Sequence, residues 1–191
     1  IGVGGIGSWL AEEVARAFSE QQIGHNVDYL IADNDIVEVD NIKYQNFTDN
    51  DIGKLKANAL AKRYAFVESL IERVSENYEL NKFDLFILCV DNNKTREFIF
   101  KYCHENNKSP KDFIDLRAEG RKVFAMQKSD SLERDLGTLN LADTENGSCQ
   151  LKSDLENGII QKGNKIVATI GIQMLLNYLR NEKNRTIALS L

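Results

Sequence analysis

Continuous apolar runs alternate along the chain with segments of helical periodicity, which is the pattern of an α/β protein. After Trp9 the apolar residues Leu10, Val14 and Phe18 recur at helical spacing. The runs VDYLIA at 27–32 and DLFILCV at 84–90 are typical of strands buried on both faces. In the first half, a helix is predicted from Trp9 to before Gly24, followed by a strand at 27–32 and a helix at 54–64. A short strand at 66–74 and a strand at 84–90 come next, and a helix begins just after Asp91 and ends near residue 106.

The second half begins with two predicted strands, 113–118 and 123–126, joined as a hairpin at Glu119 and Gly120. The segment 127–164 has no sustained period and is rich in Asp, Asn, Ser and Gly, so we expect a functional or disordered crossover-type loop. A helix at 165–180 and an edge strand at 186–189 follow. No domain boundary is apparent, so 1–191 is predicted to be a single domain.

Composition narrows the class of protein. With 191 residues and 42% hydrophobic content, the chain is long enough to bury one sizeable core. The net charge of -5 argues against a broad nucleic-acid surface, and no apolar run is long enough for a membrane span. The three cysteines form no CxxC pair, which favours a reducing cytoplasm and argues against structural zinc. Cys89 and Cys103 are expected in the core, and His25 and His104 on the solvated surface.

A glycine-rich turn precedes the first helix. Gly2, Gly4 and Gly7 fit the pattern GxGxxG, and a turn of this kind lets phosphate oxygens approach backbone N–H groups at the positive end of a helix. The pattern suits a dinucleotide as well as ATP, and it also occurs where a glycine turn merely packs a helix on a strand. Only Ile1 precedes the turn, so we expect the start of the first strand to be missing.

Two predicted strands end in acids, Asp33 and Asp91. If the sheet is parallel, both acids lie at one edge beside the glycine turn, although each alone is also common at the start of a turn or helix. Lys56 falls in the first turn of the helix at 54–64, where the helix dipole disfavours a cation unless it is exposed or near an anion. This convergence predicts a site for a negatively charged ligand.

Five features follow one another in the sequence: GVGGIGS, IADNDIVEVDN, Gln45, DIGKLKA and DLFILCVDNNKTR. In this order and spacing they closely resemble the ThiF/MoeB/HesA family, whose fold is shared with ubiquitin-activating enzymes. The resemblance implies a doubly wound Rossmann-like mixed sheet, parallel in its first half and partly antiparallel in its second. It also implies ATP-dependent adenylation of the C-terminal glycine of a ubiquitin-like or sulfur-carrier protein, with ATP and Mg²⁺ bound and a homodimer as the assembly.

The resemblance also implies roles for individual residues. Carried over by position, it makes Gly4, Gly5 and Gly7 the phosphate turn, Asp33 the ribose ligand, Asn41 a contact of the triphosphate, Lys56 a catalytic phosphate contact and Asp91 the catalytic Mg²⁺ ligand.

Two departures from the family pattern concern the same site. Tyr44 stands where the family has an arginine that grips the terminal phosphate, and tyrosine brings neither charge nor a bidentate fork. Lys43 is a neighbouring cation that offers a substitute. The upstream helix that lends another arginine across the dimer in relatives is absent from this sequence.

Cys149 lies in GSCQ within the long segment, where relatives carry a cysteine that takes up the activated tail as a thioester. Its flanks, Glu145 and Lys152, show no electropositive bias, so an ordinary loop or packing cysteine remains the other interpretation.

Three functions from different classes fit these patterns: an activating enzyme, a non-catalytic nucleotide-binding partner subunit, and a nicotinamide-dependent oxidoreductase. The last leaves Lys56 and Asp91 unexplained. A family branch that modifies tRNA through adenylation is disfavoured by the acidic composition.

Overall fold

The computed structural model describes residues 1–71, 79–105, 112–142, 150 and 152–190. Most predicted helices and strands are present. In chain order the elements are α1 (Gly7–Ser19), β1 (Tyr29–Ala32), η1 (Asn41–Lys43), η2 (Asp49–Asp51), α2 (Lys56–Arg63), β2 (Val67–Leu70), η3 (Leu80–Lys82), β3 (Leu85–Leu88), α3 (Asn93–Glu105), β4 (Asp112–Glu119), β5 (Lys122–Gln127), α4 (Leu132–Gly137), η4 (Thr138–Ala142), α5 (Lys152–Glu156), α6 (Gly163–Leu179) and β6 (Ile187–Ser190).

The strands form two sheets, β1–β2 and β3–β4–β5–β6, whose strand directions are those predicted for a mixed doubly wound fold. β1 pairs with β2 in parallel, and β3 pairs with β4 in parallel. β4 and β5 form the expected antiparallel hairpin, and β6 joins β5 antiparallel at the edge. The parallel first half and the partly antiparallel second half are thus confirmed.

Residues 1–3 connect the two groups of strands. The amino nitrogen of Ile1 donates to the carbonyl of Ile87 at 2.6 Å, and the Cys89 N–H donates back to the Ile1 carbonyl at 2.8 Å. On the other side the Gly2 N–H donates to the Ala32 carbonyl at 2.9 Å. The start of the glycine turn therefore lies between the ends of β1 and β3, which places it at the carboxyl edge of the parallel strands.

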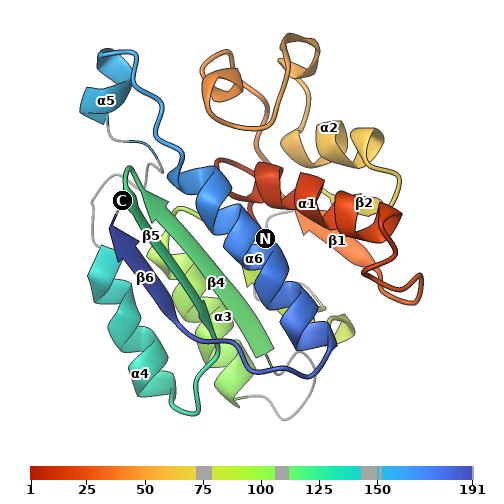
Figure 1. Cartoon of the computed structure of the whole chain (residues 1–191), viewed down its shortest axis with the longest axis vertical. Coiled ribbons are helices and arrows are strands. Elements are labelled where there is room, and N and C mark those ends of the chain that lie inside the picture. The colour runs from red at the N-terminus through yellow and green to blue at the C-terminus, as the bar shows by residue number, and fades with distance from the viewer. Residues whose placement is uncertain (72–78, 106–111, 143–149, 151, 191) are drawn as a thin grey trace.

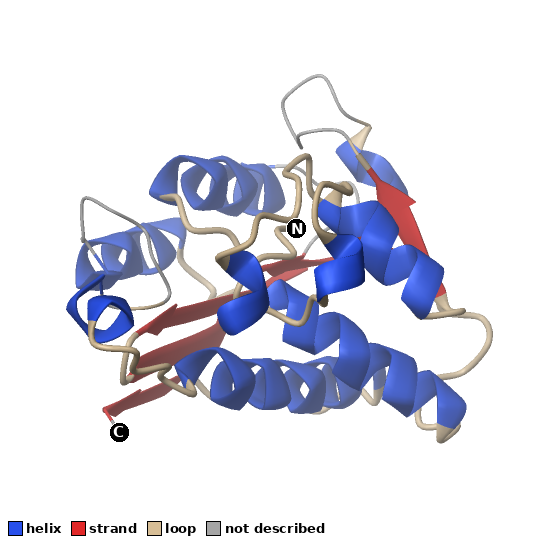
Figure 2. Cartoon of the chain, turned by 90° about the horizontal axis from the view of Figure 1, so that it is seen from above, coloured by secondary structure: helices blue, strands red, loops and turns tan. Residues whose placement is uncertain are grey.

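Helices cover both faces of the sheet (Figures 1 and 2). On one face α1 and α6 bury apolar residues against alternate positions of β3, β4 and β5. On the other face α3 packs against the intervening positions, with the rings of Phe100 and Phe113 stacked 4.3 Å apart. Since both faces are covered, the near-continuous apolar runs that predicted these strands have a physical cause.

The long segment 127–164 differs from the expectation. Among its described residues it forms α4, η4 and α5, and the Ser131 hydroxyl caps α4 by accepting the Arg134 N–H. Helices of five or six residues are too short to show a period of 3.6 in the sequence, which explains why the pattern did not predict them.

One prediction about surface residues is wrong. His104 is only 12% exposed, and its Nε2 lies 2.7 Å from the carboxylate of buried Asp135, because α3 and α4 pack together at this point. His25 is exposed, as predicted, and Cys89 and Cys103 lie in the core. In the part of the chain that the structure describes, no helix combines the length and apolarity that crossing a bilayer requires.

Candidate functional site

The glycine turn is shaped by two contacts that exclude any side chain. Gly2 has φ +81°, and a Cβ there would lie 3.0 Å from the carbonyl carbon and oxygen of Cys89. A Cβ on Gly7 would lie 2.0 Å from the Gly2 carbonyl oxygen. The turn is thus pressed against the end of β3 and against itself, so these two glycines are required by packing.

Gly4 has a different environment. A Cβ built there would meet only the end of the Gln45 side chain, at 3.9 and 4.0 Å, so packing does not require glycine at this position. Gln45 is 7% exposed, and its Oε1 has no hydrogen-bond partner among the described residues. The turn therefore has open space at Gly4, next to the buried Gln45 Oε1, which could accept a hydrogen bond from a ligand.

Asp33 ties the glycine turn to the end of β1. Its Oδ2 accepts the Val3 N–H at 2.7 Å, and its Oδ1 accepts the Asp35 N–H at 2.8 Å. The second bond is the local turn that acids at strand ends commonly make. Since each carboxylate oxygen can accept more than one hydrogen bond, the side chain retains acceptor capacity.

Lys56 is the first residue of α2, and its side chain is 9% exposed. Its Nζ lies 3.2 Å from Oδ2 of Asp35, whose side chain is 64% exposed, and its backbone N–H donates to the Asp35 carbonyl at 2.8 Å. The anion expected beside this cation is therefore Asp35. Asp33, Asp35 and Lys56 form one connected chain of contacts that begins at the glycine turn.

The electrostatics of this edge favour an anion. No side chain caps the start of α1 or of α2, and neither has an acidic residue in its first turn. The positive end of each helix dipole therefore lies at this edge without an opposing charge from the first turn of its own helix. The Lys56 ammonium adds a full positive charge at the start of α2.

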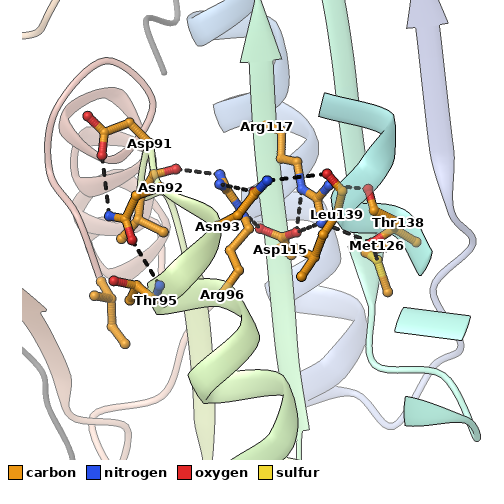
Figure 3. A network of polar contacts seen from close by, with 12 residues as sticks. Asp91, Asn92, Asn93, Thr95, Arg96, Asp115, Arg117, Met126, Thr138 and Leu139 are labelled. Atoms are coloured by element: carbon orange, nitrogen blue, oxygen red, sulfur yellow. Dashed lines mark hydrogen bonds and ion pairs between the residues drawn. The ribbon is translucent and has the colours of Figure 1, made fainter. Parts of the chain in front are cut away.

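Asp91 lies just beyond the end of β3, and Figure 3 shows it at the start of α3. The helix cap is Asn92, whose Oδ1 accepts the Thr95 N–H at 2.8 Å, so capping does not occupy Asp91. The exposed Asp91 carboxylate accepts one long hydrogen bond, 3.4 Å, from Asn92 Nδ2. Since Gly2 packs on Cys89 and on the Val90 nitrogen, Asp91 follows directly after the residues that touch the glycine turn.

A buried charge network, which the sequence analysis did not identify, supports this loop (Figure 3). The Asp115 carboxylate accepts hydrogen bonds from Nε of Arg96 at 2.9 Å and from Nε of Arg117 at 2.6 Å, and all three side chains are buried. Arg96 also donates to the Val90 carbonyl, and Arg117 donates to the Thr138 carbonyl at 2.6 Å. Burial lowers the pKa of Arg117, and the charge of Asp115 opposes that shift. The signal in the sequence was a pair of charges two residues apart in a buried strand.

The remaining predicted residues lie on the segment that follows β1. Asn41 is buried, and its Oδ1 accepts the Glu38 N–H at 3.1 Å. The Tyr44 carbonyl accepts Nε1 of Trp9 at 3.2 Å, which anchors this segment to the first turn of α1. Lys43 is exposed and pairs with Asp40 at 2.6 Å.

Asn46, also missed from sequence, joins three elements. Its N–H donates to the Ser8 hydroxyl at 3.0 Å, and its Nδ2 donates to Glu12 Oε2 at 3.1 Å and to the Tyr64 hydroxyl at 2.9 Å. It thereby holds the segment after β1 against α1 and the end of α2.

Cys149 lies outside the described residues, so its predicted role as a nucleophile stays a prediction. Gly5 is buried within the glycine turn. Burial raises the pKa of the Cys103 thiol to about 12, which leaves that cysteine protonated at neutral pH.

Known proteins resemble this chain in sequence and in fold. The ThiF family model matches residues 1–190. The tRNA threonylcarbamoyladenosine dehydratase of Haemophilus influenzae is 31% identical over 117 residues, which are 56% of this chain and 42% of that protein.

Solved structures match over the whole chain. The microcin C7 biosynthetic enzyme MccB, in complex with N-formylated MccA, is 18% identical with a TM-score of 0.70, and PaaA is 19% identical with a TM-score of 0.67. The match covers 100% of this chain in both cases, and 60% and 59% of the respective relatives. The chain thus spans less than two thirds of the length of each of these proteins. The family model extends over nearly every residue, and the protein therefore belongs to the ThiF family.

Proposed function

We propose that this protein uses ATP to adenylate the carboxylate of a peptide or small carrier protein. A ubiquitin-like or sulfur-carrier protein ending in glycine is the first candidate for that substrate. The observation that carries the proposal is the chain of contacts from the glycine turn through Asp33 and Asp35 to buried Lys56. MccB, a neighbour in fold, has been solved with ATP, and other MccB structures hold its peptide MccA.

ATP fits the groups that the site offers. Phosphates match the uncapped starts of α1 and α2, the Lys56 ammonium and the open space at Gly4. The ribose hydroxyls match the acceptor capacity of Asp33. Tyr44 supplies no positive charge for the terminal phosphate, and Lys43 is already paired with Asp40. The grip on that phosphate therefore depends on Lys56 and the backbone, with Asn41 placed on the neighbouring segment.

Mg²⁺ also fits, through a single protein carboxylate. Among the described residues no three His, Cys, Asp or Glu side chains cluster as a metal site. Mg²⁺ on nucleotides is commonly held by one or two carboxylates together with substrate phosphates, and the exposed Asp91 carboxylate suits that role. When bound, the ion would neutralise phosphate charge.

The reaction requires a negatively charged nucleophile to approach a triphosphate. A carboxylate oxygen of the substrate attacks the α-phosphorus, the bond to the bridging oxygen breaks, and pyrophosphate leaves with that electron pair. Lys56 and the positive end of the α1 dipole would hold the phosphates and reduce the repulsion between the two anions. The product is an acyl-adenylate; a nucleophile then attacks its acyl carbon, and AMP leaves.

The test is ATP–pyrophosphate exchange with a carrier protein ending in Gly-Gly. We expect exchange that depends on the carrier and falls by about 100-fold or more in Lys56→Ala and in Asp91→Ala. Matched controls are Lys62→Ala, an exposed lysine of α2, and Asp84→Ala, an exposed acid at the opposite end of β3. Exchange that survives both site variants would refute the assigned residues, and ATP binding without exchange would select a non-catalytic partner subunit.

The proposal also includes a thioester on Cys149 and a homodimeric assembly. Thioester formation on Cys149 is tested by Cys149→Ser, which should retain exchange and lose a thiol-sensitive conjugate. A homodimer is tested by sedimentation of the protein with and without ATP.

A second candidate substrate is a carboxylate on a tRNA nucleoside. The similarity to the Haemophilus influenzae tRNA threonylcarbamoyladenosine dehydratase favours it, and the net charge of -5 weighs against it. AMP formation that is stimulated by unfractionated tRNA and abolished by ribonuclease would select this substrate.

A further inference from the structure

The start of α6 contains a buried polar side chain without a partner. Asn164, the second residue of α6, is 2% exposed, and neither its Nδ2 nor its Oδ1 has a hydrogen-bond partner among the described residues. A buried carboxamide left unpaired costs about 1–3 kcal/mol, so its presence calls for an explanation.

Its neighbours in the helix place Asn164 at the carboxyl edge of the sheet. A Cβ on Gly163 would lie 2.6 Å from the Gly120 carbonyl oxygen, so the helix begins against the turn that follows β4. On the other side the Lys165 ammonium lies 3.6 Å from the centroid of the Trp9 ring, in the first turn of α1. Figure 1 shows the starts of α6 and α1 beside one another. Asn164 therefore lies between the end of β4 and the beginning of the helix that follows the glycine turn.

The electrostatic surroundings favour an incoming anionic chain end. No side chain caps α6, and its first turn contains no acidic residue. The positive end of the α6 dipole thus lies at the same edge of the sheet as the starts of α1 and α2. A terminal carboxylate on its way to the phosphates would be attracted there.

The unpaired Asn164 carboxamide has one donor group and one acceptor group, and this limits which ligand group can pair with it. A phosphate or carboxylate only accepts hydrogen bonds, so it would satisfy Nδ2 and leave Oδ1 unpaired. A backbone peptide group offers both an N–H and a carbonyl. Gln150 makes this kind of pairing nearby: its Nε2 donates to the Gln161 carbonyl at 2.9 Å, and its Oε1 accepts the Gln161 N–H at 2.9 Å.

We infer that Asn164 binds a backbone amide near the carboxyl end of the peptide or protein to be adenylated. The inference rests on the proposed function, because the substrate class comes from there. It assigns Asn164 to substrate binding, apart from the residues proposed to hold the nucleotide.

The test uses the full chain labelled with ¹⁵N-asparagine, with the analogue AMPCPP present, and acetyl-Gly-Gly as the probe. The Asn164 side-chain signals are those missing from Asn164→Leu. We expect acetyl-Gly-Gly to shift them and hexanoate, a carboxylate of similar length without an amide, to leave them unchanged. Asn164→Leu should weaken acetyl-Gly-Gly binding by about tenfold or more, while its melting temperature stays equal or rises because the unpaired carboxamide is removed.

The matched control is Gln173→Leu, which removes an exposed carboxamide from the same helix and should change neither quantity. Equal shifts with hexanoate would overturn the inference in favour of a carboxylate site. No shift with either compound, with AMPCPP bound, would mean that Asn164 pairs only with internal water and would also overturn it. A shift with acetyl-Gly-Gly in a protein that fails to bind AMPCPP would support the peptide subsite while refuting the proposed function.

Discussion

The ammonium of Lys56 and the carboxylate of Asp35 lie 3.2 Å apart, yet the lysine side chain is 9% exposed and the aspartate 64%. The lysine is held in place by its burial, whereas the aspartate is an exposed counterion at the surface. A phosphate that entered the site could therefore replace Asp35 as the partner of Lys56 without moving the lysine.

Asp35→Asn tests this exchange of partners. Without a nucleotide, the variant leaves the buried ammonium without its carboxylate, and we expect a loss of about 1–3 kcal/mol in the free energy of unfolding. ATP should restore the missing charge, so the rise in melting temperature on adding ATP should be larger in the variant than in the wild type. Differential scanning fluorimetry measures both quantities. Equal rises would show that the ammonium does not contact the phosphates, and exposed Asp28→Asn is the control.

Asp33→Ala should weaken both the fold and the glycine turn. Two backbone N–H groups, those of Val3 and Asp35, lose a charged acceptor in this variant. We expect a loss of about 2–4 kcal/mol, measured by urea denaturation, because a hydrogen bond to a charged group contributes about 1.5–3 kcal/mol and the exposed bond to Asp35 contributes less than the part-buried bond to Val3. Asp33→Asn keeps one acceptor oxygen and should lose about half as much. A loss below 0.5 kcal/mol in Asp33→Ala, within the roughly ±0.5 kcal/mol of an ordinary surface substitution, would show that these bonds do not shape the turn.

The elements of the site that follow local rules could be predicted from sequence. The glycine turn, the two strand ends and the first turn of α2 each carry a short-range signature, and parallel pairing then brings them to one edge. The Asp35–Lys56 contact could not be predicted in this way, because 21 residues separate the pair and a turn of suitable shape must form between them. Asp115 lay hidden in an apolar run, where its pairing with Arg96 depends on how α3 packs on β4.

The buried Asp51 and the half-buried Asp112 should change the stability of the fold in opposite directions as pH changes. Burial opposes ionisation of Asp51, but hydrogen bonds from Thr48 and the charge of Arg63 lower its pKa overall, below the ordinary 3.8. Its stabilisation is therefore present above pH 3.8 and lost as pH falls through the lowered value. Burial raises the pKa of Asp112 above 3.8, so its ionisation destabilises the fold as pH rises through the raised value.

Asp51→Asn should thus be less stable than the wild type at pH 7, by about 1–2 kcal/mol, and the difference should shrink as pH falls below about 4. Asp112→Asn should become more favourable relative to the wild type between pH 4 and 7. Urea denaturation at several pH values measures both differences. Parallel pH profiles for the two variants would contradict the assigned environments.

Removing one member of the Arg96–Asp115–Arg117 network should lower the free energy of unfolding more than replacing all three members with apolar residues. Asp115→Leu leaves two buried guanidinium groups without their shared carboxylate, for which we expect a loss of about 3–5 kcal/mol. Replacing all three residues with Met, Leu and Met removes every buried charge, so the triple variant should be more stable than the single one. Exposed Lys94→Met, on the same turn of α3 as Arg96, is the control. If the triple variant lost at least as much as Asp115→Leu in urea, the hydrogen bonds of the arginines to the Val90 and Thr138 carbonyls would outweigh the charge pairing. In that case the network would hold the loop before Asp91 through the hydrogen bonds of its arginines. Arg96→Lys should then lower the rate of ATP–pyrophosphate exchange at a temperature where the variant is still folded.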